Sequence, residues 1–134
     1  MVQNRNIIPV ITLKQPWASW VMEGLKLTET RTHKNFKTLE GKDFGIHAAQ
    51  TYDLSDYVLK NPYLSQKKIK ESLSYPTGVI LGMVHGKQFL KLSSYHEQGA
   101  LIECQSVQRY GLRLINPVPF KDPIPYTGEG YLVF

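Results

Sequence analysis

The feature that most constrains this fold is a series of short strand-like segments separated by glycine and proline turns. About six segments are rich in β-branched residues or alternate in polarity, namely 7–13, 27–32, 44–48, 79–92, 110–120 and 130–134. In the longest, read as one strand or a bent hairpin, Gly82 and Gly86 mark bulges or close backbone approaches. Many strands with few helices predict a small mixed β-barrel of the α+β class, because closure removes exposed edges.

One mostly buried helix is predicted directly after the first strand. Pro16 suits the first turn of a helix, where its missing N–H leaves no bond unmade. Apolar residues then recur at spacings of three and four between residues 17 and 25. Gly24 supplies the helix stop.

Further helical material is predicted over residues 53–73, where an Asn-Pro pair interrupts it. Asp53 or Ser55 could cap the first piece, and Ser65 the second. The sequence contains no internal repeat, low-complexity tract or domain boundary. Residues 1–134 are therefore expected to form a single domain.

The composition is that of an ordinary globular protein with a basic bias. The net charge of +5, from 16 Lys and Arg against 11 Asp and Glu, favours polyanionic partners. The single Cys104 excludes an internal disulfide framework and fits a reducing compartment. With no membrane-spanning run and no secretory signal, a cytoplasmic location is expected. No cofactor is implied, the histidines lack metal-ligand spacing, and the oligomeric state is left open.

Charged and polar residues bracket the predicted helix on both sides. Lys14 and Gln15 precede it, and Lys26, Glu29 and Arg31 follow it. Because side chains alternate along a strand, Glu29 and Arg31 are expected on one face, where they can form an ion pair. This pair is either a solvated surface feature of little energetic weight or part of a site, and the spacing alone leaves both open.

Three other features each allow a structural and a functional interpretation. His47 lies on an apolar strand, where an imidazole serves as a hydrogen-bonded core residue or as a ligand or base. Trp17 belongs to the helix core by its spacing, yet it lies near the charged end and could stack on a base. The lysines at 67, 68 and 70 form a solvated helix face or a surface that follows phosphates.

The stretch LKQPWASWVMEGLKLTETRT resembles the signature of the ASCH domain, in the PUA-like superfamily. The matching residues are Gln15, Pro16, Trp17 and Ala18, followed by Gly24, Lys26, Glu29 and Arg31. GIHAAQ, YPTGVILGMVHG and the closing segment YGLRLINPVPFKDPIPYTGEGYLVF are also similar to strands of this family. The resemblance covers nearly the whole chain, and its first motif is the most specific.

The resemblance implies a small PUA-like barrel with helices packed at its openings. It also implies a basic cleft between the start of the first helix and the Lys-x-x-Glu-x-Arg strand, used to bind RNA or another nucleic acid. The residues expected to bind the ligand are Lys14, Gln15, Trp17, Lys26, Glu29, Arg31 and His47. An RNA-binding module is accordingly the leading interpretation, and it rests on fold analogy.

Two other functions remain open. A branch of ASCH-like proteins hydrolyses acylated cytidines, which suggests an amidohydrolase with Lys26 as base and Glu29 assisting as acid or base. In that branch a threonine follows the lysine by three residues, and here that position is Glu29, flanked by Thr28 and Thr30. Neither threonine is an automatic substitute, because a one-residue slip moves a side chain to the opposite face. A protein-interaction or regulatory domain is the third interpretation.

Overall fold

The computed structural model describes residues 7–127 and 131–133, with side chains for the first of these ranges. The strands are β1 (Ile7–Gln15), β2 (Thr28–Arg31), β3 (Asp43–Tyr52), β4 (Val79–Lys91), β5 (Tyr110–Pro125) and β6 (Tyr131–Val133). The α-helices are α1 (Trp17–Met22), α2 (Asp56–Leu59), α3 (Gln66–Glu71) and α4 (Glu97–Ala100). Short 3-10 turns occupy Asn35–Leu39, Ser72–Ser74 and Ser94–His96.

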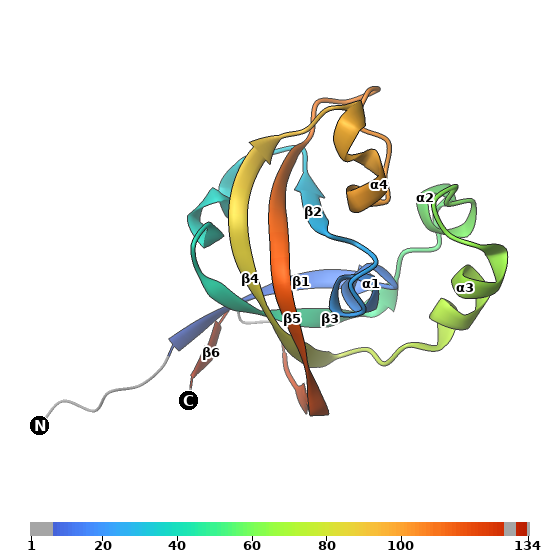
Figure 1. The fold of residues 1–134 in the computed structure, drawn as a ribbon. Helices are drawn as coiled ribbons and strands as arrows, with labels where there is room; N and C mark the ends of the chain where they lie inside the picture. The colour runs from blue at the N-terminus through green and yellow to red at the C-terminus, as the bar shows by residue number, and fades with distance from the viewer. Residues whose placement is uncertain (1–6, 128–130, 134) are drawn as a thin grey trace, which may run out of the picture.

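The strands form one mixed sheet in the order β2-β5-β4-β3-β1-β6. β1 and β3 run parallel, and every other neighbouring pair is antiparallel. The first five strands in this order make a curved half-barrel, and β6 extends the sheet by pairing with Ile7–Pro9 at the start of β1 (Figure 1). The predicted α+β architecture, a small mixed β-barrel with helices packed against it, is confirmed, with five strands in the half-barrel instead of about six. The ends of the last predicted strand, residues 130 and 134, lie outside the described part of the chain.

The long strands β4 and β5 curve together across the molecule (Figure 1). β4 is a continuous strand, and its register against β5 shifts between Ile80 and Gly82 and again beside Gly86. A Cβ at position 82 would lie only 2.3 Å from the Val118 carbonyl oxygen and 2.5 Å from Met22 Cε. The prediction of a close backbone approach at Gly82 is therefore correct.

Helix α1 packs against β1, β3, β4 and β5 and fills the concave side of the sheet. The main apolar cluster joins α1 to the strands and to the turn before β3, through Leu13, Ala18, Val21, Met22, Phe36, Leu39, Phe44, Ile46, Ala48, Leu81, Val84, Leu112 and Leu114. α1 is shorter than the predicted apolar segment, because the chain turns at Gly24, whose φ of +75° is unfavourable for other residues.

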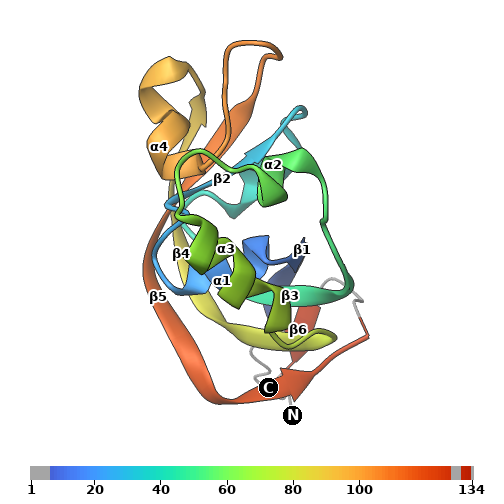
Figure 2. The ribbon, with the colours of Figure 1, turned by 90° about the vertical axis from the view of Figure 1, so that its right-hand side faces the viewer.

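The half-barrel does not close, because β1 and β2 are not paired with each other. The remaining helices gather on one side of the sheet, with α2 and α3 next to each other in sequence and α4 before β5 (Figure 2). The Ser65 hydroxyl accepts a hydrogen bond from the Lys68 amide at 3.1 Å, so the predicted cap of α3 is correct. The helices in the described ranges are all too short to cross a lipid bilayer.

Candidate nucleotide-sized site at the open seam

A cavity of about 560 Å³ spans the unpaired seam between β1 and β2. Its walls come from β1, from α1 and the strand that follows, from the end of β3 with α2, and from the segment before β5. The lining residues are Thr12, Leu13, Lys14, Trp17, Lys26, Glu29, Thr30, Arg31, Ala49, Asp53, Tyr57, Ile102 and Arg109. Cavities of roughly 300–1,000 Å³ accept small organic ligands, so this one has room for a nucleotide.

Lys26 is the most unusual residue of the cavity wall. The residue is only 3% exposed, its ammonium donates a hydrogen bond to the Ala100 carbonyl, and its Nζ lies 4.9 Å from the centroid of the Trp17 ring. Burial lowers the Lys26 pKa from 10.5 to about 8, although the nearby Glu29 carboxylate favours the charged form. The cavity thus contains an amine that can change protonation state near neutral pH.

Glu29 and Arg31 project from the same face of β2, as the alternation predicts. Arg31 Nη2 lies 3.2 Å from Glu29 Oε2, and the Glu29 side chain is 7% exposed against 34% for Arg31. The backbone amide of Thr30 donates to Glu29 Oε1 at 3.0 Å, which fixes the carboxylate further. The ion pair is confirmed, and it lies on the cavity wall instead of the solvated surface.

The two threonines that flank Glu29 differ in position. Thr30 is one of the cavity-lining residues. Thr28 is buried elsewhere, close to Gly99 and Gly111, and does not line the cavity. Thr30 thus contributes to the lining, but strand alternation directs its side chain to the face opposite Glu29 and Arg31.

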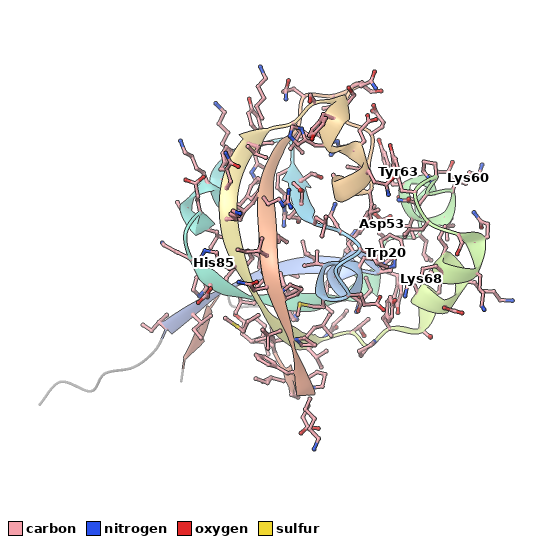
Figure 3. All side chains as sticks on the ribbon, viewed as in Figure 1. Trp20, Asp53, Lys60, Tyr63, Lys68 and His85 are labelled. Atoms are coloured by element: carbon pink, nitrogen blue, oxygen red, sulfur yellow. The ribbon has the colours of Figure 1, made fainter. Side chains whose placement is uncertain are left out.

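Trp17 is oriented by a carboxylate that the sequence interpretation treated only as a helix cap. The indole Nε1 donates to Asp53 Oδ2 at 2.8 Å, and the Ser55 amide donates to Asp53 Oδ1 at 2.9 Å. Burial alone would raise the Asp53 pKa, but these hydrogen bonds and the positive charge of Lys14 together hold it below its usual value. Asp53, labelled in Figure 3, is therefore an anion that holds the indole against the cavity.

Sequence reasoning missed Tyr57 and Arg109, which complete the wall. The Arg109 guanidinium carbon lies 5.9 Å from the centroid of the Tyr57 ring. Arg109 Nε is buried and has no hydrogen-bond acceptor among the described residues. About fifty residues separate the two in the chain, so no local spacing could have linked them.

Two residues predicted for the cleft do not line the cavity. Gln15 is fully buried: its Nε2 donates to the Ser19 hydroxyl at 2.8 Å and to the Pro76 carbonyl at 2.7 Å. Its Oε1 accepts from the Ser19 amide at 3.0 Å, so the side chain caps α1. The structure gives Gln15 a structural position between α1 and the turn before β4.

His47 is also held within the protein. Its Nδ1 lies 2.9 Å from the Thr12 hydroxyl, and its ring contacts the Tyr126 ring edge-to-face at 5.0 Å. Burial lowers the His47 pKa, opposed by a hydrogen bond with the Tyr126 backbone. These contacts match the core interpretation of His47 and leave it off the cavity wall.

The lysines of α3 lie apart from the cavity lining. Lys67 and Lys70 are exposed, and Lys68 Nζ pairs with Glu23 Oε2 at 3.0 Å. Within residues 7–127 and 131–133, no three His, Cys, Asp or Glu side chains gather closely enough to hold a metal ion. The described chemistry of the seam therefore consists of four cationic side chains, two carboxylates and two aromatic rings.

The fold and the site define a small α+β half-barrel with a charged cavity at its open seam. Its fold is similar to that of the ASCH protein from Zymomonas mobilis, with a TM-score of 0.56 and 14% identity over 87% of this chain and 71% of that one. A serine-to-alanine variant of that protein has a TM-score of 0.56 and 13% identity, over 95% of this chain and 91% of that one. A tyrosine-to-phenylalanine variant has a TM-score of 0.54 and 14% identity, over 87% of this chain and 73% of that one. No protein-family model and no curated protein matches the sequence. The chain has an ASCH-like fold, as its first motif predicts.

Proposed function

We propose that this chain binds single-stranded RNA and takes one nucleotide into the seam cavity. The observation that carries the proposal is the combination, in one nucleotide-sized space, of four cationic side chains with the rings of Trp17 and Tyr57. Cations bind phosphate, and aromatic rings stack on unpaired bases. The likeness to ASCH-domain structures supports the same class of ligand by analogy of fold.

Different side chains of the cavity recognise the phosphate and the base of the nucleotide. Lys14, Lys26, Arg31 and Arg109 offer their charges to phosphate from different edges of the cavity. Glu29 is held by Arg31 and the Thr30 amide, and it accepts hydrogen bonds from an exocyclic amine of the base. Such a carboxylate favours adenine, cytosine or guanine over uracil, which has no exocyclic amine.

The test is a titration of labelled single-stranded and hairpin RNA, followed by fluorescence anisotropy at two salt concentrations. Lys26→Met keeps the length of the side chain and removes its charge, and it is expected to weaken binding about tenfold. The slope of log affinity against log salt should fall by about 0.7 for each phosphate contact removed. Arg31→Ala should act in the same direction.

Lys70→Met is the matched control, because it removes the same charge from an exposed position outside the cavity. Its affinity should remain within about twofold of the wild-type value. Equal losses in the two lysine variants would indicate a diffuse electrostatic surface and contradict binding in the cavity. Absence of binding to every RNA would exclude the proposed function.

A second candidate, hydrolysis of an acylated nucleoside, is favoured by the buried amine of Lys26. With a pKa of about 8, a substantial fraction of this amine is neutral at mildly alkaline pH and can accept a proton. A water molecule would attack the amide carbon as the neutral Lys26 takes its proton. The C–N bond would then break, and the proton would pass to the leaving amine with the assistance of Glu29, which releases the nucleoside and the free acid.

Incubation of the protein with an acylated cytidine, followed by chromatography, tests this second candidate. Turnover should disappear in Lys26→Met and persist in Thr28→Ser, whose hydroxyl lies outside the cavity. No product above a heat-inactivated control would exclude hydrolysis of this substrate class. If neither binding nor turnover occurs, the protein-interaction interpretation is the one that survives.

A further inference from the structure

A second cavity, of about 490 Å³, adjoins the first one. The two share Tyr57 and Ile102, which therefore form the boundary between them. Beyond this boundary the second cavity is lined by Pro62, Tyr63 and Leu101, among others. Tyr63 is on the same side of the molecule as Asp53 of the first cavity, whereas His85 lies on the opposite side (Figure 3).

The second cavity is held open by a buried amide. Asn61 is 2% exposed, and its Nδ2 donates to the carbonyls of Tyr57 and Leu101, each at 2.8 Å. Its Oδ1 accepts from the Tyr63 amide at 3.0 Å. These three bonds tie the α2 segment to the segment after α4, so the cavity walls are preformed. They also leave the Asn61 amide with little capacity to read a base.

The two cavities differ in charge. The first has four cationic and two acidic side chains, whereas the second has one cation, Lys60, and two acids, Asp56 and Glu103. Lys60 Nζ lies 3.7 Å from Asp56 Oδ2, which offsets its charge. A phosphate is therefore disfavoured in the second cavity, and a flat uncharged ring is favoured there by its aromatic and aliphatic walls.

We infer that the two cavities together bind two successive nucleotides of one RNA strand. The first cavity takes a nucleotide and the phosphodiester, and the second takes the neighbouring base, stacked on Tyr63. This inference rests on the proposed RNA binding. Arg109 supports it, because its guanidinium lies against Tyr57 at the boundary that the phosphodiester must cross. Stacking accepts every base, so selectivity is expected at the first position and little at the second.

The test compares nucleoside 5′-monophosphates with 5′-phosphorylated dinucleotides by calorimetry and by amide NMR of the whole chain. The best dinucleotide is expected to bind roughly tenfold more tightly than the best monophosphate, the usual gain from one stacked base. The amide signals of Tyr63 and Leu101 should move with the dinucleotide and stay in place with the monophosphate. A tighter dinucleotide that leaves both signals unchanged would overturn the assignment of the second cavity.

Tyr63→Leu sharpens the test, because it removes the ring and keeps an apolar side chain. This variant should bind the dinucleotide no more tightly than the monophosphate, and its affinity for the monophosphate should equal that of the wild-type protein. If this variant does not fold, the NMR comparison on the wild-type chain decides the matter alone. Equal affinity for the two ligands would overturn the two-nucleotide inference and leave the proposed function standing. No binding of either ligand, or of longer RNA, would overturn the proposed function itself.

Discussion

Lys26 at the seam and the lysines of α3 form two groups that both lie in short stretches of mixed apolar and polar residues, yet their environments in the fold differ entirely. Lys26 is 3% exposed, close to the Trp17 ring, and has a pKa lowered to about 8. On α3, Lys67 and Lys70 are exposed, and Lys68 has a raised pKa, because it is hydrogen-bonded to Tyr75 and Glu23. Both groups allowed a phosphate-binding interpretation from sequence alone.

The difference between the groups is a matter of desolvation. A lysine on an exposed helix keeps its hydration, so its charge has little effect on the free energy of unfolding. A buried lysine loses hydration and destabilises the folded state while it is charged. Strongly perturbed pKa values that face a cavity are typical of functional sites, so the comparison points to Lys26 and away from α3. Four predictions test this contrast, from the largest expected effect to the smallest.

Replacing Glu29 by Gln should have the largest effect on stability. Glu29 is the buried carboxylate that favours the charged form of Lys26 and pairs with Arg31. Its neutralisation is expected to lower the free energy of unfolding at pH 7 by about 3 kcal/mol, because buried charges lose their partner. Urea denaturation measures this change. Glu71→Gln, at the exposed end of α3, is the control and should be close to neutral; equal effects would mean that Glu29 does not stabilise Lys26.

The second largest effect should be the change in the free energy of unfolding with pH that comes from Lys26. The pKa of Lys26 is about 10.5 in the unfolded chain and about 8 in the folded one. Between these values the unfolded state binds more protons, so the free energy of unfolding rises with pH, by about 3 kcal/mol in full. Below pH 8 both states are protonated and the contribution is constant.

Subtracting the pH profile of Lys26→Met from that of the wild-type protein isolates this effect, because tyrosine titration is common to both. The difference should change between pH 8 and 9.5 by about 2 kcal/mol. The same subtraction with Lys70→Met should be flat over that range. A flat difference for Lys26→Met would mean that its amine is hydrated like those of α3.

At pH 7, Lys26→Met itself should stabilise the fold. Removing the buried charge gains about 3 kcal/mol, and leaving the Ala100 carbonyl without its donor costs about 1 kcal/mol. The net gain of about 2 kcal/mol should appear as a higher urea midpoint with an unchanged slope. The same variant is expected to bind RNA less tightly, so stability and binding should move in opposite directions. A destabilised Lys26→Met would contradict this account of the cavity.

The sequence predicts the fold and the local geometry of this site better than it predicts which side chains line the cavity. Local rules were sufficient for the Glu29–Arg31 pair and for the close approach at Gly82, because strand alternation and missing side chains act within a few residues. The resemblance to ASCH domains predicted the fold itself. The single-domain expectation and the binding roles of the site residues remain predictions.

Tertiary packing decides what the sequence could not show. Tyr57 and Arg109 meet only because the half-barrel brings α2 beside the segment before β5. Gln15 and His47 have side chains suited to a ligand, yet internal hydrogen bonds occupy the Gln15 amide and Nδ1 of His47. The local sequence pattern indicates which face of a strand or helix a side chain occupies. It does not indicate which buried polar groups already have hydrogen-bond partners within the protein.

The smallest expected effect belongs to Lys68, the one α3 lysine with a clear ion pair. Its Nζ lies 3.0 Å from Glu23 Oε2, and the Tyr75 hydroxyl also donates to Glu23. Because both charged side chains remain partly exposed, Lys68→Met is expected to change the free energy of unfolding by less than about 0.5 kcal/mol, and less at high salt. RNA affinity should change no more than it does for Lys70→Met. A loss as large as that of Lys26→Met would place α3 in the binding surface and remove the distinction between the two groups of lysines.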